Sequence, residues 1–186
     1  MPPRTDRLIL RQLTVEDRPA LNAMLQDPRT MIAYEGPFSE AEVTEWLDRQ
    51  LTRYRDDGHG LWAVVLRQTG ALIGQCGVSW QDIDGRHVLE VGYLFNRARW
   101  GHGYATEAAR ACRDWAFTEL GADEVFAQVR DTNIASMNVA IRLGMTIRSQ
   151  FVKRYRGVDM PHNAFAIDRA AWTVQVARES VPNPSH

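Results

Sequence analysis

The sequence predicts one mixed α/β domain with a central, mostly antiparallel sheet flanked by helices. Three observations predict it. The spacing of apolar residues along the chain indicates strands and helices in the order β-α-α-β-β-β-α-β-α-β-β. The 186 residues are 45% hydrophobic and 24% charged, which is ordinary for a globular domain with its own core. No repeat or Pro/Gly/Ser-rich linker interrupts the chain before its end, so we expect a domain over 1–178 and a flexible tail over 179–186.

The first third of the chain predicts a strand followed by two helices. Residues 8–13 have the pattern of a strand, and Thr14 is a candidate N-cap for a helix that extends to about Gln26. Ser39 and Glu42 have the spacing of a capping box. A set of mostly apolar side chains then recurs at helical intervals, which predicts a second amphipathic helix: Val43, Trp46, Leu47, Gln50, Leu51 and Tyr54.

The middle of the chain changes to the period of strands. Strands over 61–66, 72–79 and 88–95, with turns at 68–70 and 82–85, predict an antiparallel meander. Glycines then mark the ends of two helices, one over 106–120 and one over 135–143, separated by a strand over 124–129. The remaining strands, 147–155 and 164–168, resemble a hairpin joined by a connection over 157–163.

Charge and composition exclude several classes of function. A net charge of −1 argues against a nucleic-acid or membrane binder, because phosphate affinity needs clustered surplus cations. No apolar leader or membrane span is visible, so we expect the protein in the cytoplasm. Cys76 and Cys112 are expected as buried apolar residues. No metal site is expected, because His87 and Glu90 point to opposite faces of a strand, while His59 and His162 lie near predicted turns at the surface.

A glycine-containing loop precedes the helix over 106–120. Gly101, Gly103 and Ala105 leave little side chain beside the free N–H groups of the helix N-terminus, which suits a phosphate. The alternative is a tight turn that needs glycine only for its dihedral angles. A dinucleotide fold is disfavoured because Thr106 occupies the third glycine position and three closely connected strands precede the loop. The lysine of a Walker A loop is absent.

At this loop the sequence resembles the GNAT acetyltransferases, whose signature is Gln/Arg-x-x-Gly-x-Gly/Ala. Here the signature reads Trp100-Gly101-His102-Gly103-Tyr104-Ala105, with Trp100 in place of the general Gln or Arg. The longer run to Ala108 resembles the subgroup that includes ribosomal-protein N-terminal acetyltransferases. Segments 5–11, 90–93 and 133–145 are similar to further blocks of that subgroup in the same order, so the resemblance covers nearly the whole chain.

The resemblance implies a site for acetyl-CoA as co-substrate, in which backbone amides from Gly101 to Ala105 hold the pyrophosphate. It further implies that Tyr93, Leu94 and Phe95 offer strand-edge groups to pantetheine. Arg142 is either a phosphate ligand or a solvated helix residue. The full cofactor set is Tyr93, Leu94, Phe95, Trp100, Gly101, His102, Gly103, Tyr104, Ala105, Thr106, Asn133, Ser136 and Arg142.

Acetylation of an amine needs a base for the amine and a proton for the departing thiolate. Glu90 is the candidate general base, acting through water, because a carboxylate in an apolar strand is costly to place; a salt-bridged strand residue is the alternative. Asn133 suits contact with pantetheine or substrate, or a helix N-cap. The resemblance implies that Ser136 donates a hydrogen bond to the CoA sulfur; a helix-surface serine is the alternative. Many other members of the family have a tyrosine four residues further on, where this chain has Ala140.

The expected activity is direct transfer of acetyl to an amine, which belongs either to a protein N-terminus or to a small molecule. Four aromatic residues line an acceptor cleft or pack in the core: Tyr34, Phe38, Trp46 and Trp62. The alternative function is a non-catalytic acyl-CoA sensor or interaction module. The sequence leaves both the acceptor and the choice between monomer and homodimer open.

Overall fold

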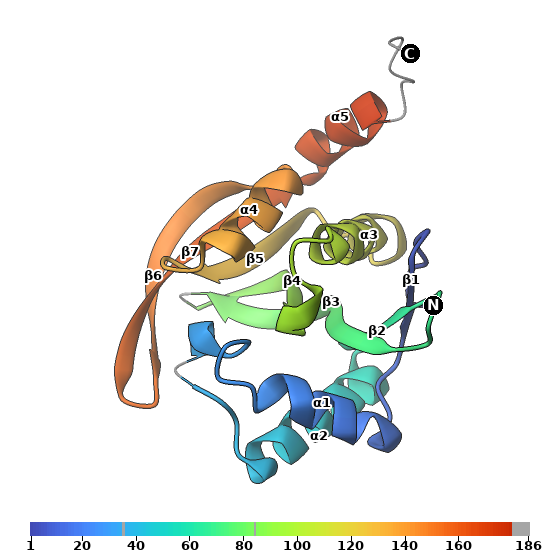
Figure 1. Ribbon diagram of the computed structural model, residues 1–186. Coiled ribbons are helices and arrows are strands. Elements are labelled where there is room, and N and C mark those ends of the chain that lie inside the picture. The colour runs from blue at the N-terminus through green and yellow to red at the C-terminus, as the bar shows by residue number, and fades with distance from the viewer. Residues whose placement is uncertain (35, 84, 180–186) are drawn as a thin grey trace.

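A computed structural model describes residues 1–34, 36–83 and 85–179. It contains a seven-stranded sheet with helices on both faces (Figure 1). The strands are β1 (Leu8–Arg11), β2 (Leu61–Leu66), β3 (Leu72–Ile83), β4 (Arg86–Phe95), β5 (Glu124–Arg130), β6 (Thr146–Tyr155) and β7 (Val158–Asp168). The α-helices are α1 (Arg18–Leu25), α2 (Glu40–Asp56), α3 (Tyr104–Glu119), α4 (Ile134–Arg142) and α5 (Arg169–Glu179); η1 (Val15–Asp17), η2 (Ile32–Tyr34) and η3 (Arg97–Arg99) are 3₁₀ turns. The predicted mixed α/β class is confirmed.

The sheet order is β1-β2-β3-β4-β5-β7-β6, and all neighbours are antiparallel except β4 and β5. These two strands run parallel, and the ladder joins them only where Glu90 lies opposite Phe126. Beyond that point β4 and β5 diverge, so the sheet is split at its centre. Backbone groups on the facing edges of the split have no strand partner across it, which makes them available to a ligand.

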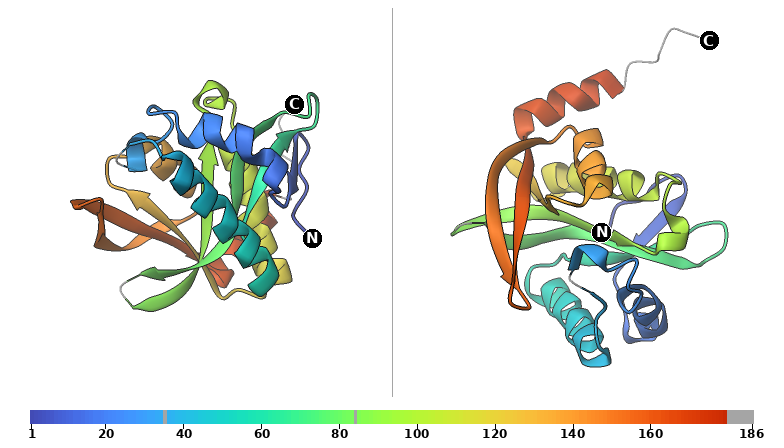
Figure 2. Two further views of the ribbon diagram at one scale, coloured as in Figure 1. Left: turned by 90° about the horizontal axis from the view of Figure 1, so that it is seen from below. Right: turned by 60° about the vertical axis from the view of Figure 1, so that its left-hand side comes forward.

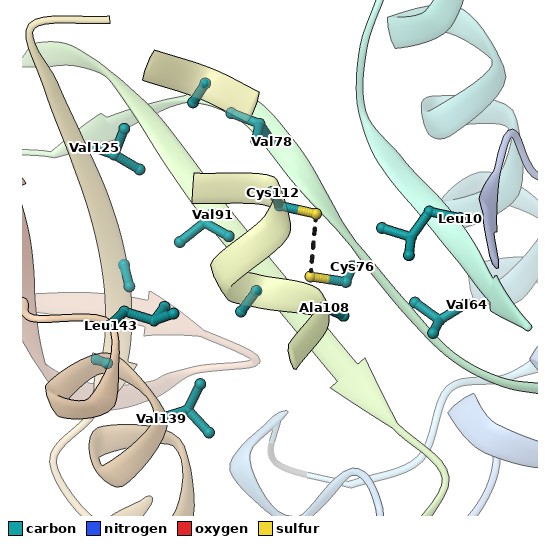
Figure 3. Close-up of a cluster of buried hydrophobic side chains, with 14 of the residues drawn as sticks. Leu10, Val64, Cys76, Val78, Val91, Ala108, Cys112, Val125, Val139 and Leu143 are labelled. Carbon is teal, nitrogen blue, oxygen red and sulfur yellow. Dashed lines mark hydrogen bonds between the residues drawn. The ribbon is translucent and has the colours of Figure 1, made fainter. Parts of the chain in front are cut away.

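Helices cover both faces of the sheet, with α3 and α4 on one face and α1 and α2 on the other (Figures 1 and 2). The α3 face holds the larger core, in which Trp62 and Phe117 are among the largest fully buried side chains. Cys76 from β3 and Cys112 from α3 meet in this core, with their sulfurs 3.6 Å apart (Figure 3). Both cysteines are buried and free, as expected from the sequence.

Helix α2 begins where its capping residue predicts, whereas the segment after Thr14 opens with a 3₁₀ turn and becomes α-helical only at Arg18. Thr14 caps η1, which leads directly into α1, and Pro19 occupies the first turn of that helix, where its missing N–H costs nothing. Ser39 and Glu42 form the predicted capping box: the Ser39 N–H donates to the Glu42 carboxylate at 2.7 Å, and the Glu42 N–H donates to Ser39 Oγ at 3.3 Å. This reciprocal pair fixes the start of α2.

Replacing Ser39 with alanine is expected to destabilise the protein by about 1 kcal/mol, because a helix N–H loses its side-chain acceptor. Ser39→Gly is the matched control and should cost only a few tenths of a kcal/mol, since a small N-cap leaves the helix end open to water. Urea unfolding of both variants measures the difference. Equal midpoints for Ser39→Ala and the wild type would show that this cap contributes nothing to stability.

The last two strands form a tighter hairpin than the sequence predicts. The expected connection over 157–163 is wrong: Arg156 and Gly157 alone join the strands, and their φ angles of +50° and +77° match a two-residue turn. Pro161 therefore lies within β7. It is tolerated because the ladder with β5 ends at the Arg130–His162 pair: the Pro161 carbonyl still accepts a hydrogen bond from the Asp131 N–H at 3.0 Å, and the missing proline N–H lies past the end of β5.

Helix α5 was not predicted, because its apolar residues do not gather on one face and none of its side chains is buried. It is held against α3 by two contacts of Trp172: the indole stacks on Phe117 with ring centroids 4.7 Å apart, and its N–H donates to Asp114 at 2.7 Å. Glu179, the first residue of the predicted tail, is the last residue of α5. The rest of that tail, 180–186, lies outside the described residues. Among the helices described, none has the length and apolarity needed to cross a membrane.

Candidate active site

A cleft of about 1530 Å³ opens at the split between β4 and β5. Its lining includes the start of α3 and α4 at one end, and η2, α2 and the β6–β7 hairpin at the other. Every residue predicted for catalysis or cofactor binding lines this cleft except His102. The fold thus brings together segments that are far apart in the sequence.

Strand β4 leaves fewer backbone groups free to bind a ligand in the split than the sequence suggests. Asn96 N–H donates to the Ile73 carbonyl at 2.9 Å, and along the same register Leu94 turns its backbone groups toward Gln75 in β3. Tyr93 and Phe95 turn theirs toward the split, but the Phe95 carbonyl accepts a hydrogen bond from the Trp100 indole at 2.8 Å. The expected strand-edge contact from Leu94 is therefore corrected to Tyr93 and the Phe95 N–H.

The glycine loop has the geometry of an anion site. Gly101 and Gly103 both have φ of +78°, and Gly103 is the N-cap of α3. Glu107 N–H donates to the Gly103 carbonyl at 3.0 Å, so the amides of Tyr104, Ala105 and Thr106 precede the first intrahelical bond. A Cβ on Gly101 would meet no atom within 4 Å, whereas one on Gly103 would lie 3.5 Å from Arg7. The open side of the loop therefore lies at Gly101.

The N-terminal segment fixes this loop, a role that the sequence reasoning missed. Arg7 forms an ion pair with Glu107 at 2.6 Å and donates to the His102 carbonyl at 3.0 Å. Thr5 also donates to Glu107, at 2.6 Å. The His102 ring stacks on Tyr104 with centroids 5.5 Å apart, and this places its side chain outside the cleft. His102 accordingly contributes its backbone to the loop rather than its imidazole.

Besides Arg7, three further arginines line the cleft near the glycine loop. Arg99 lies in η3, Arg110 in α3 and the exposed Arg142 at the end of α4. Only Arg142 was predicted from the sequence; the signal for Arg110 was its position, two turns after the helix start. These guanidinium groups can hold phosphates bidentately, which complements the backbone amides of the loop.

The side chain of Glu90 links β4 to β5 at the point where the two strands separate. Its carboxylate accepts hydrogen bonds from the Gln128 backbone N–H and side-chain amide of β5, both at 3.2 Å. Burial raises the pKa of Glu90, and the charges of Lys153 and Arg53 together with the Gln128 hydrogen bonds partly offset this rise. Tyr34 and Tyr93 also lie within electrostatic range of Glu90. A carboxyl group with a raised pKa suits proton abstraction near neutral pH.

Ser136 and Tyr93 form a hydroxyl pair across the split. The Ser136 hydroxyl donates to Tyr93 Oη at 3.1 Å, and Tyr93 Oη donates to the Ser136 carbonyl at 3.0 Å. Asn133 is the N-cap of α4, with its side-chain oxygen accepting the Ser136 N–H at 3.1 Å, while the residue also lines the cleft. The N-cap interpretation of Asn133 is confirmed, and its amide nitrogen remains available to a ligand. Tyr93 as a partner of Ser136 was missed.

The far end of the cleft is aromatic. Tyr34, Phe38 and Trp46 line it, with Phe38 in edge contact with the other two rings. Trp62 does not line it, since this residue is 1% exposed and packs against Trp115. Of the four aromatic residues considered from the sequence, three therefore line the cleft, and Phe38 also belongs to the core under α1 and α2.

The two histidines expected at the surface are buried. His59 Nδ1 lies 2.8 Å from the Val78 carbonyl, and His162 Nδ1 lies 2.8 Å from the Met160 carbonyl. His162 lines the cleft, and burial lowers its pKa, so the ring is neutral at pH 7. The part of the chain that the structure describes contains no cluster of three or more side chains able to hold a metal ion.

Comparison with known proteins gives consistent matches. The profile of the acetyltransferase (GNAT) domain matches residues 7–146. The Bacillus subtilis protein YkkB is 38% identical over 142 residues, which cover 76% of this chain and 83% of that protein. YnaD of the same organism, named as an N-acetyltransferase, is 29% identical over 81% of this chain and 85% of its own length. The crystal structure of an acetyltransferase from Agrobacterium tumefaciens superposes with a TM-score of 0.75 at 31% identity, covering 89% of this chain and 93% of that one.

Proposed function

The chain belongs to the GNAT acetyltransferase family, and from this membership we propose that it transfers acetyl from acetyl-CoA directly to an acceptor amine. The fold is the GNAT fold, and the protein is an acyltransferase. The observation that carries the proposal is the cleft itself. Along one continuous surface lie a glycine loop with free helix amides, an unpaired strand edge and a partly buried carboxylate, which together suit an acyl-CoA and an amine.

The residues present fit acetyl-CoA. The amides at the start of α3 and the arginines beside them suit its phosphates, and the β4 edge at Tyr93 suits the amides of pantetheine. Acetyl-CoA supplies the thioester carbon on which the amine acts. No covalent intermediate with the protein is proposed, and both cysteines are buried away from the cleft lining.

Side chains of the protein act on protons at two places in the reaction. Glu90 takes the proton of the attacking amine through a water molecule while the new C–N bond forms. As the C–S bond breaks, the Ser136 hydroxyl turns from Tyr93 Oη to donate a hydrogen bond to the departing sulfur, and the thiolate takes its proton from solvent water. Burial raises the pKa of Tyr93, so its hydroxyl stays protonated and keeps donating to the Ser136 carbonyl.

Removing one member of the hydroxyl pair should have a moderate effect. We expect Ser136→Ala and Tyr93→Phe each to lower kcat about 3- to 30-fold, because the other hydroxyl or a water still reaches the sulfur. The affinity for acetyl-CoA should stay within threefold of wild type, a small change in free energy. Steady-state rates with direct binding titrations separate the two effects. A loss confined to binding would make the pair a structural contact only.

The acceptor amine belongs either to a protein N-terminus or to a small molecule. The likeness of the loop to ribosomal-protein N-terminal acetyltransferases supports the first class. The aromatic wall of Tyr34, Phe38 and Trp46 accommodates either. We propose that the protein acts in the cytoplasm, as expected from its sequence. Its active form is proposed to be a monomer or a homodimer.

A panel of amines and short peptides, assayed for CoA thiol release with acetyl-CoA, tests the proposed function. Release that depends on a particular amine supports an acetyltransferase acting on that class. Tight binding of acetyl-CoA with no release for any amine or peptide would favour the alternative, a non-catalytic acyl-CoA sensor.

A further inference from the structure

The acceptor half of the cleft, formed by η2, α2 and the β6–β7 hairpin with the facing sheet, is strongly basic. Arg49 and Arg53 of α2 and Lys153 and Arg154 of β6 all line it. Among the described residues that line the cleft, Glu90 is the one carboxylate in this half. The others, Asp6, Glu107 and Asp114, belong to the N-terminal segment and α3 at the cofactor end. The basic character is therefore local, since the whole chain has a net charge of −1.

The described part of the chain shows no ion pair for these four cations, although the charges of Glu90 and Asp57 reach Arg53 and act to raise its pKa. The neighbouring Arg55, by contrast, pairs with Asp56 at 2.7 Å. Arg53 is half-buried; burial lowers its pKa, and the nearby charge of Arg49 lowers it further. A partly desolvated, unpaired guanidinium is costly, and an anion arriving with a ligand would offset that cost.

Two of the cations flank the candidate base. Arg53 from α2 and Lys153 from β6 both act on the Glu90 carboxylate, since the charge of each lowers its pKa. An amine placed to lose its proton toward Glu90 therefore lies within reach of both side chains. A second ammonium group on the acceptor would be repelled there, while a carboxylate or phosphate would be attracted. The anionic group must be only a few bonds from the amine.

The acceptor half is also closed on one side, which favours a compact acceptor. Arg156, in the turn between β6 and β7, forms an ion pair with Glu42 and donates to the Pro37 carbonyl. This ion pair lowers the pKa of Glu42 to about 2, so it persists across the physiological pH range. The turn thus reaches the segment that starts α2, and the bent hairpin is visible beside that helix in Figures 1 and 2.

We propose that the acceptor is a small primary amine that carries a carboxylate or a phosphate close to the amine, and that Arg53 and Lys153 bind this anion. The inference rests on the proposed acetyltransferase function. It selects one acceptor class from those left open above and disfavours polyamines and other polycationic amines.

Matched acceptor pairs test the proposal with the wild-type enzyme and acetyl-CoA. Tryptophan against tryptamine tests a carboxylate, and O-phosphoethanolamine against ethanolamine tests a phosphate. Spermidine and a short peptide with aspartate at position two complete the panel. Values of kcat/KM are compared per free amine, after correction for the ionisation of each acceptor. We expect the anionic member of at least one pair to be preferred at least tenfold, and the preferred pair identifies the anion.

Variants then test the assigned residues. Arg53→Gln and Lys153→Gln should each raise KM for the preferred anionic acceptor at least fivefold, while changing KM for its neutral partner less than twofold. Arg55→Gln is the matched control, because Arg55 is exposed on the same helix, pairs with Asp56 and does not line the cleft. It should leave both KM values unchanged.

Each other outcome overturns the inference in a distinguishable way. Equal or greater kcat/KM for neutral amines or spermidine would refute the anionic acceptor while leaving the acetyltransferase in place. Preference for the peptide over every small amine would refute a small acceptor. Unchanged KM in both variants would refute the roles of Arg53 and Lys153. No thiol release with any acceptor, despite acetyl-CoA binding, would remove the proposed function and the inference with it.

Discussion

Replacing Glu90 with glutamine is expected to slow turnover roughly 10- to 1000-fold near neutral pH, because the amine loses its general base. The lower part of this range applies to weakly basic amines. An amine with a pKa near 8 is already partly neutral at pH 7.5, whereas deprotonating an amine with a pKa near 10.4 at this pH costs about 4 kcal/mol. The affinity for acetyl-CoA should change little, since Glu90 lies on the acceptor side of the split.

The pH dependence distinguishes a base from a structural residue. In the wild type, activity requires ionised Glu90 and is lost as pH falls through its raised pKa. In Glu90→Gln that limb disappears, and the rate recovers partly as pH rises and free amine accumulates. A pH–rate profile of both proteins measures this. Wild-type rates with an unchanged profile would remove Glu90 from the mechanism, and Tyr93 or water would be the next candidate.

The glutamine variant should remain folded. Its side-chain oxygen can still accept the Gln128 N–H that Glu90 now accepts. The raised pKa also bears on stability. In the folded protein the pKa of Glu90 lies above its unfolded value near 4.3, so ionising this carboxylate costs more in the folded state than in the unfolded chain. At pH values above the folded-state pKa, the ionised Glu90 therefore lowers the free energy of unfolding. Glu90→Gln should therefore unfold at a urea concentration no lower than wild type at pH 7. A clear decrease would identify Glu90 as a structural group.

Replacing Gly103 with valine is expected to weaken acetyl-CoA binding at least tenfold, or about 1.4 kcal/mol. Two effects combine. A β-branched residue does not readily adopt the φ of +78° found at Gly103. Its Cβ would already be in contact with Arg7 at 3.5 Å, so the two methyl groups beyond it would crowd the side chain that holds His102 and Glu107. The loop must then rearrange and misplace its amides. Isothermal titration with acetyl-CoA measures the loss.

Two further variants make this result specific. Gly121→Val is the matched control for backbone strain, because Gly121 has φ of +67° and open space, but lies beyond the other end of α3 and outside the cleft. It should leave acetyl-CoA affinity unchanged. His102→Ala should cost less than Gly103→Val, since the imidazole does not line the cleft. Unchanged affinity in a folded Gly103→Val variant, or equal losses in Gly103→Val and His102→Ala, would contradict the assigned anion site.

Local signals predicted the element order and the anion loop from the sequence. Ser39 with Glu42 placed the start of α2, and the short apolar run over 61–66 matches the fully buried β2, because caps and short apolar runs act within a few residues. The glycines at 101 and 103 indicated backbone geometry that the structure contains. Errors arose where the local pattern was weak or misleading: the connection predicted over 157–163 is mostly strand, and the apolar residues of α5 do not form one face.

The sequence by itself therefore determined the family, the fold and the position of the glycine loop, since each depends on short-range patterns of residues. Tertiary structure alone decided which side chains meet. The Arg7–Glu107 contact joins residues 100 positions apart, and Tyr93 reaches Ser136 across 43. The basic acceptor half likewise combines α2 with β6, on opposite sides of the split. Such contacts follow from the divergence of β4 and β5, and no local pattern encodes the distance between two strands after they separate.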